Sequence, residues 1–188
     1  AVIGRLRDGI SVPFGVNVLW DPMATMALAV ATGASFVREI FTGTYASDMG
    51  VWAPDAGAAR RYQARLGIGH VVTLYNVSAE FAGSLDPRNL PDRARSAVFS
   101  SIPDAVLVSG AITGEAAAMS DLEAVKRVLP MTPVLANTGV KHATVADVLA
   151  VADGCIVGSA LKHGGDTWAA VDPDRARDFM DRVRKARK

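Results

Sequence analysis

The chain has 188 residues, of which half are hydrophobic, and its net charge is +1. This composition is too apolar for a disordered chain, and the balanced charge gives no electrostatic reason to expect nucleic acid or membrane partners. The single cysteine, Cys155, forms no internal disulfide, which favours a reducing, cytoplasmic setting, and no apolar run reaches the length of a membrane span. We expect one globular domain over residues 1–188.

One pattern repeats along the chain: a short apolar run, a polar or glycine-rich turn, and a longer stretch with helical spacing. Most of the apolar runs lack strict alternation with polar residues, which is typical of parallel strands that are buried on both faces. We expect strands at 14–19, 36–41, 70–77, 104–109, 133–138 and 154–159.

The stretches between these runs carry helix signals. Asp21 precedes Pro22, which places a capping carboxylate before a proline at the first helical position. Ser120 and Glu123 have the spacing of a capping box. We expect helices at 22–32, 55–66, 87–99, 120–129, 144–151 and 173–187.

Six strand–helix units in strict alternation predict a parallel sheet with helical crossovers. Two α/β architectures fit: an open doubly wound sheet, and a (β/α)8 TIM barrel without its first two units. A whole barrel takes about 250 residues, and segment 1–10 has the character of a helix end, as such a cut would leave. No GxGxxG or P-loop motif follows a predicted strand. We therefore predict the TIM barrel, with the N-terminal two βα units missing from this chain.

In a parallel barrel the active site gathers at the loops that follow the strands. These loops and strand ends hold the candidate catalytic residues Asn17, Glu39, Asp48 and Glu80, whose carboxylates and amides suit proton transfer and carbonyl polarisation. Glu39 is adjacent to Arg38 within an otherwise apolar strand, so that one of the two points inward. That residue is either a catalytic group or half of a structural ion pair.

The last two predicted strands end in small polar residues and glycine. Barrels often bind phosphate with the loops after strands seven and eight, where backbone N–H groups of small residues and a basic side chain suit an anion. The alternative is that the glycines only end the strands. We expect a substrate phosphate to bind at Asn137, Thr138, Gly139, Gly158, Ser159 and Lys162.

No metal and no organic cofactor is predicted. His142 and His163 lie on the site side of the sheet, but a two-histidine metal site lacks the support of an HExxH or similar spacing. Cys155 lies within a predicted strand and is interpreted as a small core residue rather than a nucleophile. The absence of GxGxxG and P-loop motifs also disfavours hydride transfer and phosphoryl transfer. The strand-end residues suit isomerase or lyase (aldolase-type) chemistry.

A set of short stretches, distributed over essentially the whole chain, carries a resemblance to a known family. These stretches are 15–21, 31–34, 36–39, 41–48, 108–110, 113–114, 137–139, 152–154, 158–162 and 171–173 with Arg175. In them the chain resembles the BtpA family, and its SgcQ-like branch in particular. The resemblance implies a barrel of the ribulose-phosphate-binding kind with more residues at the N-terminus.

What the resemblance implies about function divides between two branches. The SgcQ-like branch is associated with sugar catabolism, and the other branch with photosystem I biogenesis. Many BtpA-type members carry a Val-Lys-His-type motif after the middle strand, where this chain has a different sequence at 75–80, and this departure favours the sugar-associated branch. We expect an enzyme acting on a small phosphorylated sugar-like metabolite; the alternative is a non-catalytic photosystem I assembly factor. A homo-oligomer is compatible with either.

Overall fold

The computed structural model describes residues 2–112 and 114–187, so Thr113, which belongs to one of the matching stretches, lies outside the described residues. Six parallel strands form the main sheet, and their order in the sheet is their order in the chain. The strands are β1 (Gly15–Val16), β2 (Phe36–Glu39), β5 (Val72–Asn76), β7 (Ala105–Val108), β8 (Val134–Ala136) and β9 (Gly154–Cys155).

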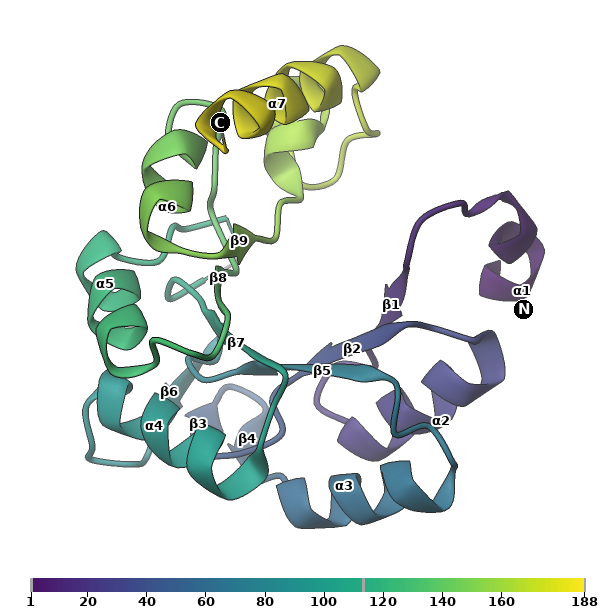
Figure 1. Cartoon of the computed structure of the whole chain (residues 1–188), viewed down its shortest axis with the longest axis vertical. Helices are drawn as coiled ribbons and strands as arrows, with labels where there is room; N and C mark the ends of the chain where they lie inside the picture. The colour runs from purple at the N-terminus through teal and green to yellow at the C-terminus, as the bar shows by residue number, and fades with distance from the viewer. Residues whose placement is uncertain (1, 113, 188) are drawn as a thin grey trace.

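Each strand lies within a predicted apolar run and is shorter than that run. A doubly wound sheet reverses its strand order at a switch point. The described strands show no such reversal, so the doubly wound alternative is wrong. Figure 1 shows that the sheet curls, with helices following one another along its outer side. The described part of the chain is therefore a half-barrel of α/β type.

Seven α-helices are present in the described residues, and each predicted helix has a counterpart among them. The Asp21 carboxylate caps α2, accepting a hydrogen bond from the Ala24 amide at 2.8 Å. The capping box at Ser120 is wrong, because α5 begins at Met119 after Ala118, which has no side-chain acceptor. The helices are α1 (Val2–Leu6), α2 (Pro22–Thr32), α3 (Ala56–Arg65), α4 (Leu90–Ser101), α5 (Met119–Val128), α6 (Val145–Val151) and α7 (Pro173–Ala186).

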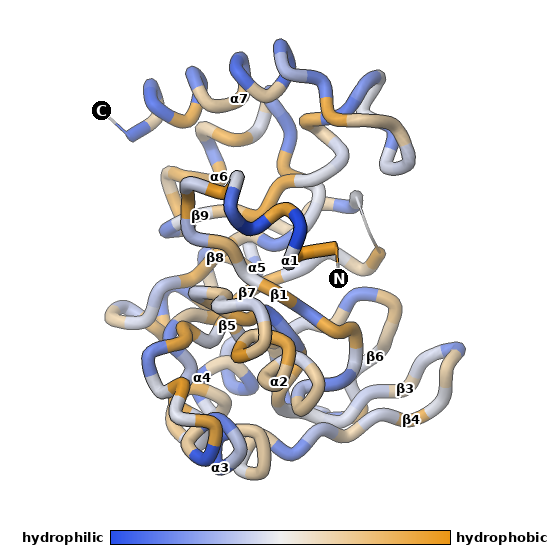
Figure 2. Tube along the Cα trace, turned by 90° about the vertical axis from the view of Figure 1, so that its right-hand side faces the viewer, coloured by the Kyte–Doolittle hydropathy of each residue, from blue (hydrophilic) through white to orange (hydrophobic). Residues whose placement is uncertain are grey.

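A second, antiparallel sheet was not predicted. It pairs β3 (Tyr45–Ser47) with β4 (Gly50–Trp52) as a hairpin and with β6 (Ala82–Ser84) on the other side. The hairpin comes from the loop after β2 and the third strand from the loop after β5. Figure 2 shows the β3–β4 hairpin extending away from the body of the molecule. Some polar residues of these two loops therefore lie in the hairpin and not at the carboxyl ends of the main-sheet strands.

The core consists of two main clusters on the helix side of the sheet. One joins β1, β2 and β5 to α2 and α3, and within it the rings of Phe41 and Tyr75 stack with centroids 4.4 Å apart. The other joins β7 and β8 to α4, α5 and α6, with Phe179 of α7 against it. The helices thus pack against the outer face of the sheet, and polar residues lie at the carboxyl ends of the strands. No described helix is both long and apolar enough to cross a membrane.

Candidate functional site

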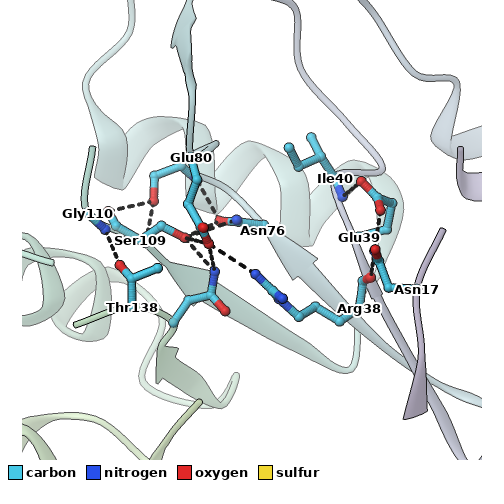
Figure 3. Close-up of polar contacts among 11 residues, drawn as sticks. Asn17, Arg38, Glu39, Ile40, Asn76, Glu80, Ser109, Gly110 and Thr138 are labelled. Atoms are coloured by element: carbon cyan, nitrogen blue, oxygen red, sulfur yellow. Dashed lines mark hydrogen bonds and ion pairs between the residues drawn. The ribbon is translucent and has the colours of Figure 1, made fainter. Parts of the chain in front are cut away.

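A network of polar side chains joins the carboxyl ends of neighbouring strands β2, β5, β7 and β8 (Figure 3). Glu80 Oε1 accepts hydrogen bonds from Asn137 Nδ2 at 2.7 Å and from Arg38 Nη2 at 3.0 Å. The Ser109 hydroxyl receives hydrogen bonds from Asn137 Nδ2 at 2.6 Å and from Asn76 Nδ2 at 3.0 Å. Because residues from four strands share these contacts, the network holds Glu80 in one position.

Glu39 forms a second polar group on the other side of Arg38. Its side chain is buried, with 3% exposure, and its Oε1 accepts a hydrogen bond from the Ile40 amide at 2.9 Å. Asn17 donates to Glu39 Oε2 and to the Arg38 carbonyl oxygen. Burial raises the pKa of the Glu39 carboxyl, against the opposing effect of the hydrogen bonds from Ile40, Asn17 and the Trp20 amide. A buried carboxyl of raised pKa is a candidate for proton transfer.

Arg38 and Glu39 are adjacent on β2 but have different partners. The Arg38 guanidinium forms an ion pair with Glu80, and the side chains are 36% and 13% exposed respectively. Glu39 is held by amides instead. The ion pair anticipated for this strand is therefore present, and it connects β2 to the loop after β5, leaving Glu39 as the carboxyl outside it.

Glu39→Gln should change the pH dependence of stability. Because burial raises the folded-state pKa of this carboxyl above its ordinary value of 4.5, its contribution to stability is fully present below pH 4.5 and is lost as the pH rises through the folded pKa. The free energy of unfolding of the wild type should thus fall relative to Glu39→Gln above pH 4.5. Urea unfolding at a series of pH values measures this difference, with the exposed Glu123→Gln as control. A difference that is constant with pH would contradict the assignment.

Two adjoining cavities lie at these strand ends. The larger, of about 710 Å³, is within the size range of small-molecule sites. The smaller, of about 50 Å³, is lined by Asn17 and Glu39, and Arg38 and Glu80 line both. Of the predicted site residues, those lining the larger cavity are Glu80, Asn137, Thr138, Gly139, Gly158 and Ser159.

The structure does not bring two predicted site residues to these cavities. Asp48 is exposed in the turn between β3 and β4, because pairing of β3 with β6 carries the hairpin outward. Lys162 donates from Nζ to the carbonyl oxygen of Thr167 and is absent from the lining of the larger cavity. The loop folds so that the Lys162 ammonium binds the backbone of Thr167 in the same loop rather than lining the cavity.

The small cavity has a strained rim. Trp20 and Phe81 line it, and both have positive φ, 60° and 62°, a conformation that costs energy for bulky residues. Trp20 stacks on Trp52 of the hairpin with ring centroids 5.5 Å apart. This stacking joins the Trp52 end of the hairpin to the loop after β1. Backbone strain of the kind seen at Trp20 and Phe81 is concentrated at functional sites in proteins.

Several residues of the site were not singled out from the sequence. Asn76 and Ser109 each stand at or just after a strand end, which is the signal that would have found them. Arg175 lines the larger cavity from the first turn of α7, far from any strand end in the sequence. Both site-side histidines have partners: His142 Nε2 lies 2.9 Å from the Arg175 carbonyl oxygen, and His163 Nδ1 lies 3.2 Å from Asp172 Oδ2.

The chain is similar in sequence to proteins of one family. The sgc region protein SgcQ of Escherichia coli K12 is 46% identical over 187 residues, covering 100% of this chain and 70% of that protein. The photosystem I biogenesis protein BtpA of Synechocystis is 30% identical over 182 residues, covering 96% of this chain and 63% of that one. This chain thus spans about two thirds of the length of these relatives.

The structural comparison agrees with the half-barrel. The N-(5'-phosphoribosyl)anthranilate isomerase from Pyrococcus furiosus superposes with a TM-score of 0.65 at 18% identity, covering 97% of this chain and 79% of that one. This likeness shows a TIM-barrel-like fold and no more. The family model described as the BtpA family matches residues 1–185, and the chain therefore belongs to the BtpA family.

Proposed function

We propose that this chain belongs to an enzyme that transfers protons at carbon in a small phosphorylated sugar-like metabolite, as an isomerase or an aldolase-type lyase. The observation that carries the proposal is the pair of carboxyl groups, Glu39 and Glu80, on either side of Arg38 at the strand ends (Figure 3). Two carboxyls in unlike environments are the arrangement that acid–base catalysis at one substrate uses.

The three side chains have separate roles in this proposal. Glu39, with its raised pKa, holds and delivers the proton, and Asn17 keeps its carboxyl in place. Glu80 takes a proton on the other side of the substrate, oriented by Asn137. Arg38 supplies the positive charge that stabilises an enolate-like oxygen as it forms.

The larger cavity suits the rest of the substrate. Its volume of about 710 Å³ is ample for a phosphorylated sugar, and its lining includes Asn137, Thr138, Gly158 and Ser159. These are small polar residues at the ends of β8 and β9, where barrels commonly bind phosphate. This supports the phosphorylated substrate class.

We also propose that the half-barrel is part of an eight-stranded barrel of the ribulose-phosphate-binding type, whose first two βα units lie outside this chain. The edge strands β1 and β9 are not paired with each other within the described residues, and the match spans 70% of SgcQ. A structure of the full-length protein in which two further parallel strands join β1 to β9 is the expected result. An edge strand left open in that structure would overturn it.

Phosphorylated sugars tested against the full-length protein should distinguish an enzyme from a binding protein. At least one is expected to raise the melting temperature through linkage. The same compound should then incorporate deuterium from D2O at a carbon next to its carbonyl, or be cleaved, as followed by NMR. Binding without exchange and without cleavage would rule out the acid–base proposal and favour a metabolite-binding regulator.

A second candidate function is a non-catalytic assembly factor for photosystem I. The name of the BtpA relative suggests it. The β3–β4 hairpin exposes Met49 and Val51, 67% and 72% accessible, as a scaffold contacting a partner would. Growth complementation separates the two: a scaffold should tolerate Glu39→Gln and Glu80→Gln, whereas an enzyme should lose function with either.

A further inference from the structure

Arg175 is held with its guanidinium facing the larger cavity. It lies in the first turn of α7, and its Nε donates to the Ala160 carbonyl oxygen at 3.0 Å. Its own backbone amide donates to Asp172 Oδ1 at 3.2 Å. Among the described residues no hydrogen bond or ion pair engages its terminal Nη1 and Nη2 groups. One nitrogen therefore fixes the plane of the guanidinium, while the outer two remain available to a ligand.

Glycines form part of the cavity lining on this side. Gly164 and Gly165 line the cavity with positive φ, 62° and 76°, and Arg175 Nη2 lies 3.8 Å from where a Cβ on Gly165 would stand. A Cβ on Gly158 would meet nothing within 4 Å. Ser159 adds a hydroxyl to the same wall. These residues leave space for a tetrahedral anion in front of the guanidinium.

The charges that line the cavity are unbalanced. Arg38, Lys141 and Arg175 are cationic, and Glu80 is the carboxylate among the described lining residues. Glu80 is paired with Arg38 at 3.0 Å, at the end of the cavity that adjoins Glu39. At the Arg175 end the Asp172 carboxylate interacts with both Arg175 and His163 but lies outside the cavity lining. The lining itself therefore carries more positive than negative charge, which favours an anionic ligand there.

We propose that Arg175 binds the phosphate of the ligand, and that Lys162 braces the loop instead. The proposal rests on the phosphorylated substrate class proposed above. A guanidinium presents two parallel N–H groups to a phosphate, which an ammonium cannot do. With its phosphate on Arg175, the ligand directs its uncharged end toward Arg38 and Glu80. Arg175 thus selects a phosphorylated over an unphosphorylated substrate.

Inorganic phosphate is the probe for a calorimetric titration of the full-length protein. Arg175→Gln should weaken phosphate binding about 10- to 100-fold, as expected for loss of charged hydrogen bonds. Arg177→Gln is the matched control, because Arg177 is exposed on the same helix and pairs with Asp174. Both Arg177→Gln and Lys162→Gln should bind within about two-fold of wild type, since neither residue lines the cavity.

Arg175→Lys keeps the proposal testable if Arg175→Gln fails to fold, which circular dichroism would reveal. It retains the charge without the paired N–H groups, so binding should weaken several-fold. Wild-type affinity in both Arg175 variants would overturn the proposal, as would loss of binding in Lys162→Gln alone or no phosphate binding by the wild type.

The proton-transfer proposal and the Arg175 proposal are contradicted by different results. Deuterium exchange that does not depend on a phosphate group would leave the proton-transfer proposal standing while Arg175 loses its role. Conversely, the result could be phosphate binding that depends on Arg175 without exchange or cleavage of any sugar. That result would support the anion site and contradict the proposal that the protein is an enzyme. The two measurements therefore report separately on the two proposals.

Discussion

Gly139→Ala should destabilise the folded protein by about 3–5 kcal/mol, since it combines a left-handed backbone with a steric clash. Gly139 has a φ of 65°. A Cβ there would lie 2.2 Å from the Ala116 amide nitrogen and 2.4 Å from the Glu115 carbonyl carbon. These are backbone atoms of the segment after β7, which cannot yield as a flexible side chain would. Urea unfolding monitored by circular dichroism measures the loss.

Gly158→Ala is the matched control for this measurement. Gly158 is also a glycine after a late strand of the sheet, but its φ is −125° and a Cβ would meet nothing within 4 Å. Its substitution should change the free energy of unfolding by no more than about 0.5 kcal/mol. Equal effects of the two substitutions would show that Gly139 does not hold the two loops in close contact.

Glu39→Gln should lower kcat by about 10²- to 10⁴-fold, the range attributed to loss of a general acid or base. Glutamine keeps the shape of the side chain and its contact with the Ile40 amide but cannot exchange a proton. Because burial raises the pKa of the Glu39 carboxyl, the wild-type rate should also depend on pH above the ordinary range of glutamate. That dependence should disappear from the residual activity of Glu39→Gln.

Asp48→Asn serves as the comparison for Glu39→Gln. Asp48 is exposed in the hairpin turn and lines neither cavity. Its substitution should leave kcat within about two-fold of wild type. Loss of activity in Asp48→Asn together with full activity in Glu39→Gln would move the proton-transfer site from the strand ends to the hairpin.

The sequence by itself determined the order and type of the main elements. Strands buried on both faces are continuous apolar runs, and each of the six runs contains a strand. Helix starts depend on a few neighbouring atoms, so Asp21 indicated the start of α2 correctly. The capping box at Ser120 failed because the N-cap lies two residues earlier, at Ala118, a difference that local spacing does not resolve.

The antiparallel sheet depended on contacts between distant segments. Its strands have three residues each, too few to show a period, and they form because Tyr45 pairs with Trp52 on one side and Ser84 on the other. That pairing moved Asp48 away from the strand ends. The positions of residues in long loops are set by such pairing, which sequence spacing alone does not determine.

For the site, the sequence determined which residue types stand at strand ends, and parallel strands bring those ends to one edge of the sheet. Glu80 and Asn137 meet for this reason, although 57 residues separate them. Which carboxyl pairs with Arg38, and whether Lys162 or Arg175 lines the larger cavity, was decided only by tertiary structure. Arg38 binds Glu80 rather than its neighbour Glu39, and a turn of the last loop directs Lys162 to Thr167 while α7 directs Arg175 inward. Side-chain direction at such positions follows from packing between elements that are remote in sequence.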